Sequence, residues 1–428
     1  MSFFRFSVFA MVFIGFGAGA QRAAALDAPT TLHRARPAES HFSEAHRTSS
    51  HRAVATHAAQ KAAPATHQVR LTARGSARAS ARRAAAIGTR KHHYYERFTA
   101  SSFANGDIFS SDITAGEDPV VRRAAIDAMG DMNGTAVVID PSNGRILAMV
   151  NQKLALSPGA EPCSTIKITV AMAALSEGLV TRDTPVQLAG FRMNMTQALA
   201  KSNNLYFEEL GRQLGFERVR HYANQFGLGE LAGYNIDGEQ LGVYPDQELP
   251  ASEGGVARMC SFGQGVSLTP LQLGAYVAAL ANGGTLFYLQ HPTTAAEAAA
   301  LQPKVKRTLD IARYVPDIED GMAGAVEYGT ARRLRANFHE LPVFGKTGTC
   351  SDKGTRFGWF AAFSDSPQGS LVTVFFLEGG RPTFGPRAAE LTGEFYKNLW
   401  DRNWFAAKGQ QDAASVSAPA TTDQQTQP

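Results

Sequence analysis

The order of strand and helix patterns along the chain is the feature that most restricts its fold. Two apolar, β-branched runs flank a glycine-containing turn within residues 134–150, which is typical of a β-hairpin. Helical patterns fill residues 164–328, three strand patterns follow within 341–379, and a last helix is expected over about 387–405. Strands and helices do not alternate as in a parallel sheet. The order predicts an α+β fold, in which strands from both ends of the chain form one antiparallel sheet flanked by helices.

The beginning of the chain differs from the rest. Residues 1–26 combine Arg5 with an apolar run and small residues suited to a signal peptidase. The run is shorter than the ~20 residues of a membrane span, which favours a cleaved export signal over an uncleaved anchor in the inner membrane. Residues 27–115 are expected to be a disordered linker, residues 116–406 the folded domain, and residues 407–428 a disordered tail. Export predicts that the domain works in the periplasm or cell envelope.

Charge is distributed unevenly along the chain. Residues 28–97 contain 13 Lys/Arg against 3 Asp/Glu and hold eight of the 11 His, whereas residues 98–428 contain 27 Lys/Arg against 34 Asp/Glu. The basic linker is therefore either a solvated tether or a polycation that contacts membrane lipids or cell-wall polymer. Nucleic acid is disfavoured as a partner, because an exported linker meets little of it.

The three cysteines, Cys163, Cys260 and Cys350, would face an oxidising compartment after export. An odd number leaves at least one free thiol or an intermolecular bond. A Cys163–Cys350 bridge is one possibility, because each of the two adjoins a motif described below; it would also require close Cα spacing. The sequence contains neither CxxC nor HExxH, so we predict no metal site, and we expect no cofactor.

Residues 163–167, Cys-Ser-Thr-Ile-Lys, contain two candidate nucleophiles and a candidate base. On a helix, Cys163 and Ser164 would each share a face with Lys167, at separations of four and three residues. The apolar residues around Lys167 predict partial desolvation, which lowers the pKa of an amine and makes it usable as a general base. Spacing alone leaves the choice between the thiol and the hydroxyl open.

Two further motifs, Ser202-Asn-Asn204 and Lys346-Thr-Gly348, follow in that order. The first lies between two helical patterns, where it either offers a hydroxyl and an amide to a cleft or caps the next helix. Lys346 is either a binding-site cation or an ordinary lysine on an edge strand. Gly348 would let the backbone of a ligand approach closely. Thr347 and Thr349 add hydroxyls suited to a carboxylate.

In this order, the three motifs resemble those of the penicillin-binding protein transpeptidase domain, within the serine β-lactamase-like superfamily. The resemblance covers about residues 134–405 and includes "VVIDPSNGRILAMV", "ALAKSNNLYFEELGRQLG" and "SFGQGVSLTPLQLGAYVAALANGG". It implies a β-lactamase/transpeptidase-like fold and a serine acyltransferase that cross-links peptidoglycan stem peptides ending in D-Ala-D-Ala. It also implies covalent inhibition by β-lactams, and other cell-wall synthesis proteins as possible partners.

The resemblance implies a role for each matched position. Ser164 would be the acylated nucleophile and Lys167 its base, which decides between Ser164 and Cys163. Ser202 would relay a proton to the leaving amine, and Asn204 would orient the substrate amide.

The strand motif would hold the end of the substrate. Lys346 would supply positive charge to the cleft, Gly348 the close approach, and Thr347 and Thr349 the contacts to the terminal carboxylate. The backbone N–H groups of Ser164 and Thr349 would form the oxyanion hole.

The sequence departs from the family pattern before the nucleophile. Cys163 stands where the family usually has a small residue, often Gly, and the segment between the hairpin and Ser164 is short. We expect neither a glycosyltransferase domain nor a large N-terminal pedestal before the hairpin. We therefore expect a nearly bare transpeptidase domain on a tether.

Three alternatives of the same fold remain open at this point. A D,D-carboxypeptidase would use the same residues with water as the acyl acceptor. A serine β-lactamase is disfavoured, because no ExxLN-like segment follows Asn204 and class D enzymes typically have an apolar residue at that position. A β-lactam-binding sensor would retain acylation without turnover.

Overall fold

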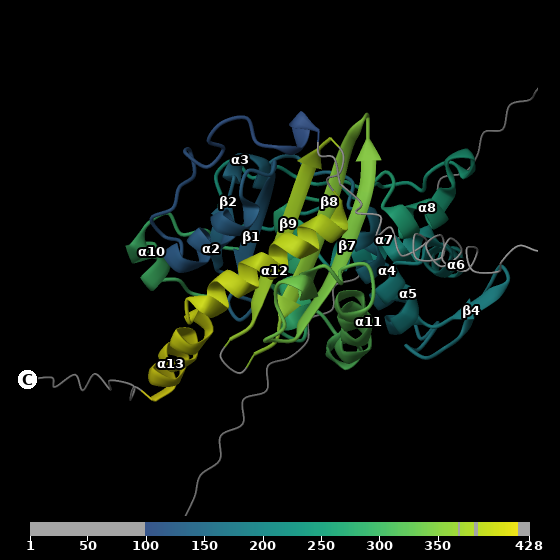
Figure 1. Cartoon of the computed structure of the whole chain (residues 1–428). Coiled ribbons are helices and arrows are strands. Elements are labelled where there is room, and N and C mark those ends of the chain that lie inside the picture. Colours follow the sequence, from purple (N-terminus) through teal and green to yellow (C-terminus); the bar gives the residue numbers. More distant parts are fainter. Residues whose placement is uncertain (1–98, 367–368, 381–383, 418–428) are drawn as a thin grey trace, which may run out of the picture. The chain divides into compact units, whose positions relative to one another are not determined.

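The computed structural model describes residues 99–366, 369–380 and 384–417 (Figure 1). The expected export signal at 1–26, most of the expected linker, and residues 418–428 of the expected tail lie outside these ranges. In the described part, no helix has both the length and the apolar composition needed to cross a bilayer.

A five-stranded sheet forms the centre of the domain, in the order β2-β1-β9-β8-β7, and every neighbouring pair is antiparallel. Its strands are β1 (Gly134–Ile139), β2 (Ile146–Val150), β7 (Val343–Asp352), β8 (Thr355–Ser364) and β9 (Leu371–Gly379). The expected hairpin is β1–β2, and β1 pairs directly with β9, the last strand among the described residues. The prediction of one antiparallel sheet built from both chain ends is confirmed.

Alternating side chains bury both faces of the sheet. Val137 and Val374 belong to one hydrophobic core with α4 and α9, whereas Val138 and Phe375 belong to a second core with α2 and α12. Figure 1 shows α12 lying across β7–β9. The sheet is therefore the middle layer between two sets of helices.

The helices have clear start and stop signals. Asp118 caps α2 by accepting hydrogen bonds from two backbone N–H groups, and Thr269 forms a capping box with Gln272 at the start of α9. On the α2 and α12 side are α2 (Pro119–Met129), α12 (Gly385–Asp401) and α13 (Trp404–Ser417). The other helices are α3 (Gln152–Ala155), α4 (Lys167–Ser176), α5 (Met195–Lys201), α6 (Asn204–Leu214), α7 (Phe216–Gln225), α8 (Gly255–Phe262), α9 (Pro270–Ala281), α10 (Ala295–Ala299) and α11 (Val315–Glu327).

Some elements were not expected from the sequence. Two small antiparallel sheets, β3–β4 (Val186–Leu188 and Phe191–Met193) and β5–β6 (Thr285–Phe287 and Val305–Thr308), interrupt the helical block. Their strands have three or four residues each, too few for a clear alternating pattern.

The predicted domain boundaries are too narrow at both ends. The last helix divides at Asn403, which has a left-handed backbone, and α13 runs through Ser417 into the segment expected to be a disordered tail. Trp404 donates to Asp118, and Lys408 pairs with Asp140 at 2.7 Å, which holds α13 on the domain. At the other end, the Asp112 side chain, which is 1% exposed, pairs with Arg122, so residues assigned to the linker belong to the fold.

Candidate active site

Three segments that are distant in sequence bring the predicted site residues together. Ser164 lies in a 3-10 turn, η3 (Cys163–Ile166), and Lys167 begins α4. In a 3-10 turn, side chains three residues apart align closely, which suits this pair better than a regular helix. Ser202 lies in the turn between α5 and α6, Asn204 is the first residue of α6, and β7 supplies Lys346.

The amine of Lys167 is the centre of the cluster. Its Nζ atom lies 3.0 Å from Ser164 Oγ, 3.2 Å from Ser202 Oγ, 2.9 Å from the Ser202 carbonyl oxygen and 2.6 Å from Asn204 Oδ1. The carbonyl and amide oxygens only accept, so they use two N–H groups of the amine. In its neutral form, the amine then has a lone pair free to accept a proton from a hydroxyl.

Burial prepares Lys167 for this role. The side chain is fully buried, and desolvation lowers its pKa from 10.5 to about 7, although the charge of Glu208 on α6 acts in the opposite direction. The ring of Phe207 lies 5.6 Å from the Nζ atom. A large fraction of the amine is thus neutral near pH 7, as the apolar surroundings predicted.

The turn between α5 and α6 owes its shape to Ser202, whose φ of 52° is in the left-handed region and ends α5. Asn203 caps α6 by accepting from the N–H of Tyr206. The alternative that this motif caps the next helix therefore applies to Asn203. Ser202 and Asn204, on either side of Asn203, contact Lys167 instead. The motif thus combines a structural cap with two site residues.

Lys346 is on an edge strand, yet it is fully buried. Its Nζ atom donates to Ser202 Oγ at 2.8 Å and to the carbonyl of Thr347 at 3.0 Å. Desolvation and, secondarily, the charge of Lys167 hold its pKa well below the usual range. The alternative of an ordinary solubilising lysine is therefore wrong. Ser202 Oγ lies within hydrogen-bond distance of both amines.

The remaining strand residues differ in their surroundings. Thr347 shares a 2.6 Å hydrogen bond with Thr330, a site neighbour that no motif indicated. Thr349 is exposed, and its Oγ1 accepts from the N–H of Gly385 at the start of α12. The close approach expected at Gly348 is made by the protein itself: a Cβ there would lie 2.8 Å from the Pro162 carbonyl oxygen. Gly348 therefore lets η3 pack against β7.

A disulfide joins Cys163 to Cys350, with a Cα–Cα separation of 5.6 Å, and Cys260 is a buried free thiol. The bridge considered possible from the sequence is present. It removes Cys163 as a nucleophile and leaves Ser164 as the hydroxyl beside the amine. The cluster is thus suited to hydroxyl activation followed by acyl transfer.

The chain is similar to a known family over most of the domain. The family model described as "Penicillin binding protein transpeptidase domain" matches residues 134–397. Stage V sporulation protein D of Bacillus subtilis is 28% identical over 316 residues, which are 61% of this chain and 48% of that protein. Peptidoglycan D,D-transpeptidase MrdA of Acinetobacter baumannii is 24% identical over 357 residues, 66% of this chain and 52% of that protein. The chain spans about half the length of these two relatives.

Solved structures show the same fold. A crystal structure of Pseudomonas aeruginosa PBP2 in complex with WCK 5153 aligns with a TM-score of 0.56 at 23% identity, covering 67% of this chain and 74% of that one. A chain of a structure described as "Structural coordination of polymerization and crosslinking by a peptidoglycan synthase complex" aligns with a TM-score of 0.52 at 22% identity. The alignment covers 67% of this chain and 61% of that one. The expected transpeptidase-like α+β architecture is confirmed.

Proposed function

Because the chain belongs to the penicillin-binding protein transpeptidase family, we propose that it is a D,D-transpeptidase that cross-links peptidoglycan stem peptides through an acyl-enzyme on Ser164. The observation that carries the proposal is the position of the buried Lys167 amine, within hydrogen-bond distance of both Ser164 Oγ and Ser202 Oγ. One nitrogen can therefore take a proton from the nucleophile and pass it to a second hydroxyl.

Acylation follows from this geometry. Neutral Lys167 accepts the Ser164 proton as Oγ attacks the carbonyl of the penultimate D-Ala, and the backbone N–H groups of Ser164 and Thr349 hold the developing oxyanion. Collapse of the tetrahedral intermediate breaks the peptide bond. The proton passes through Ser202 to the leaving amine, and D-Ala departs. Asn204 fixes the Lys167 amine at 2.6 Å and orients the substrate amide.

Deacylation repeats these steps with a new acceptor. An amine from a neighbouring stem peptide attacks the ester, loses a proton through the same relay, and releases Ser164 with a new amide bond. β-Lactams mimic the D-Ala-D-Ala end and acylate Ser164, and they would be released slowly.

The carboxylate of the substrate completes the charge balance of the cleft. Lys346 is buried beside another amine, which disfavours its charged form in the free protein. A substrate carboxylate bound by Thr347 and Thr349 would favour the ammonium form again. Gly348 supports this arrangement indirectly, because it brings η3 against the strand.

The test is acylation followed by transfer with the purified protein. We expect a fluorescent penicillin to label the wild type and not Ser164→Ala, and a pentapeptide donor with an amine acceptor to yield free D-Ala and a cross-linked product by mass spectrometry. Labelling of Ser164→Ala would overturn the assignment. D-Ala release with hydrolysed donor alone would indicate a carboxypeptidase, rapid loss of the penicillin label a β-lactamase, and stable labelling without either product a sensor.

We also propose that the protein acts in the periplasm or cell envelope, where the basic residues 28–97 contact membrane lipids or cell-wall polymer. Other cell-wall synthesis proteins are candidate partners. We expect deletion of residues 28–97 to weaken sedimentation of the protein with isolated cell envelopes at low salt, because screening removes such contacts at high salt. Unchanged sedimentation at low salt would leave these residues as a tether.

A further inference from the structure

The Cys163–Cys350 disulfide joins two segments that are 187 residues apart in sequence. Cys163 immediately precedes Ser164, and Cys350 immediately follows Thr349. Ser164 and Thr349 are the residues whose backbone N–H groups are proposed to receive the oxyanion. The bridge is therefore one residue from each proposed donor.

The backbone at Cys163 is in a conformation that only glycine adopts freely. Its φ is 51°, and the side chain is fully buried. A left-handed conformation is unfavourable for a residue with a Cβ, because the Cβ comes too close to the following carbonyl oxygen. Surrounding contacts have to hold such a residue in place. Without them, the turn that carries Ser164 would relax toward a commoner conformation.

Several contacts hold this turn, and the disulfide is the covalent one. Trp359 on β8 donates its indole N–H to the Glu161 carbonyl oxygen at 3.0 Å. The sulfur atoms of Cys163 and Cys350 lie 3.4 Å and 3.7 Å from the same oxygen. The turn is thus fixed to β8 by a hydrogen bond and to β7 by the bridge.

The β7 side has its own reason to need a tether. β7 is an edge strand whose sheet partner is β8, and beyond Thr349 the two strands form a hairpin end with exposed residues at 351–354. Such an end bends more easily than the centre of a sheet. Fixing Cys350 to η3 restrains Thr349 just before that end.

We propose that the Cys163–Cys350 disulfide sets the spacing of the two oxyanion-hole N–H groups, so that a dithiol can reversibly slow acylation of Ser164. This inference rests on the proposed function. Cys350 is partly exposed, whereas Cys163 is fully buried, so the first thiolate attacks the sulfur of Cys350 and Cys163 leaves as a thiolate. The second thiol of the dithiol then displaces Cys350. Two protein thiols form and the dithiol becomes a disulfide.

The effect belongs to the chemical step. An oxyanion donor stabilises charge that develops only in the transition state, so its displacement lowers the acylation rate constant k2 and changes the preceding dissociation constant K little. Complete loss of one donor costs roughly 10²- to 10³-fold, and we expect a shift in spacing to cost about tenfold. A bridge that only stabilised the fold would change the melting temperature and leave k2 alone.

The experiment uses the full chain in three states. Wild type is assayed oxidised, reduced with dithiothreitol and desalted under argon, and reoxidised with oxidised glutathione, with k2 and K from stopped-flow labelling by a fluorescent penicillin. Thiol counts in denaturant verify each state. Cys350→Ser removes the bridge, and Cys260→Ala, which lacks the buried free thiol, is the matched control.

We expect reduction to lower k2 about tenfold, reoxidation to restore it, Cys350→Ser to match the reduced protein and ignore the dithiol, and Cys260→Ala to behave as wild type. Equal k2 in oxidised and reduced wild type, or a full-rate Cys350→Ser, would overturn the inference alone. Absence of any adduct with oxidised wild type would instead overturn the proposed function.

Discussion

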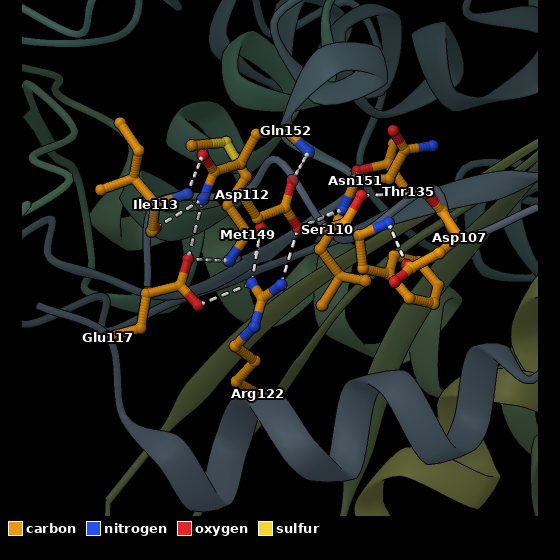
Figure 2. Close-up of polar contacts among 12 residues, drawn as sticks. Asp107, Ser110, Asp112, Ile113, Glu117, Arg122, Thr135, Met149, Asn151 and Gln152 are labelled. Atoms are coloured by element: carbon orange, nitrogen blue, oxygen red, sulfur yellow. Dashed lines mark hydrogen bonds and ion pairs between the residues drawn. The ribbon is translucent and has the colours of Figure 1, made fainter. Parts of the chain in front are cut away.

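A cation lies at each edge of the central sheet among buried polar groups, and the two edges have opposite effects on its charge. Near the β7 edge, the groups in contact with the amines of Lys167 and Lys346 are hydroxyl, carbonyl and amide oxygens. Near the β2 edge, Arg122 lies between two carboxylates (Figure 2). The surroundings of Lys167 and Lys346 therefore favour the neutral amine, whereas those of Arg122 favour the charged guanidinium.

The Arg122 cluster is fully paired. Its guanidinium donates to Asp112 at 2.7 Å and to Glu117 at 2.9 Å, and both carboxylates are almost completely buried. Burial by itself would lower the pKa of Arg122, but the hydrogen bonds and charges of the two acids raise it. Asp112 also accepts from the N–H groups of Asn151 and Gln152, so the cluster ties the segment before α2 to the end of β2.

The partners of the cation determine whether an edge of the sheet contributes to stability or to reactivity. A cation with buried carboxylate partners keeps its charge, and its removal destabilises the fold because the carboxylates stay buried. A buried amine among hydroxyls and amides loses its charge easily and becomes a base. Substitution at one edge should therefore change chemistry, and substitution at the other should change stability.

Replacing Lys167 tests the reactive edge and has the largest expected effect. Lys167→Met keeps most of the side-chain volume and removes the base, so we expect k2 for a fluorescent penicillin to fall roughly 10²- to 10⁴-fold. The free energy of unfolding should change by less than about 1.5 kcal/mol, because methionine fills a similar volume and the amine that it replaces is easily neutralised. Lys153→Met, at an exposed position on α3, is the control. A rate within tenfold of wild type would exclude Lys167 as the base.

Replacing Arg122 tests the paired edge. Arg122→Met removes the guanidinium that pairs with two buried carboxylates, although Glu117 keeps its contact with His291, so we expect the free energy of unfolding in urea to fall by about 3–5 kcal/mol. Acylation well below the melting temperature should be unchanged. Arg123→Met is the matched control, because the Arg123 side chain is 69% exposed, against 12% for Arg122. We expect it to lower the free energy of unfolding by less than about 0.5 kcal/mol. Similar losses in the two variants would contradict the comparison.

The sequence predicted the reactive edge better than the paired one. Ser164 and Lys167 are three residues apart, so one local turn makes their contact, and the apolar neighbours of Lys167 indicated its desolvation. Strand patterns at the two chain ends predicted the sheet. The burial of Lys346 did not follow from its edge strand, because Ser202, whose hydroxyl accepts from its amine, lies 144 residues away in sequence.

The remaining differences also come from long-range contacts. Asp112 looked like part of a polar linker until Arg122 and the start of α3 supplied its partners. The tail looked disordered, although Lys408 reaches Asp140 across 268 residues of sequence. The disulfide depends on a Cα separation that no spacing rule gives. Local composition therefore underestimated the domain at both ends.

The pH dependence of acylation measures how far the reactive edge has lowered the pKa of Lys167. The amine accepts a proton only when neutral, and its pKa is lowered from 10.5 to about 7. We expect k2/K to rise with pH up to about 7 and to fall about tenfold per unit below it. Stopped-flow labelling from about pH 5 to about pH 9 gives this profile. A profile that still rises about tenfold per unit at pH 9 would show that the pKa of Lys167 stays near the ordinary lysine value of about 10.4 and that the amine remains charged, as Arg122 does.

Glu208 provides the smallest and most specific test, because it is a carboxylate whose charge reaches the reactive edge. Its charge raises the pKa of Lys167 against the larger effect of burial, so Glu208→Gln should move the midpoint of the k2/K profile to lower pH, by less than about one unit. Glu209→Gln is a close control, since Arg212 pairs with both glutamates, at 3.4 Å and 3.1 Å, and each variant removes one of these pairs. An equal shift in both variants would assign the effect to Arg212. A shift to higher pH in Glu208→Gln would mean that the Glu208 carboxylate does not favour the charged form of Lys167. Proximity of carboxylates would then not explain why Arg122 keeps its charge and Lys167 loses it.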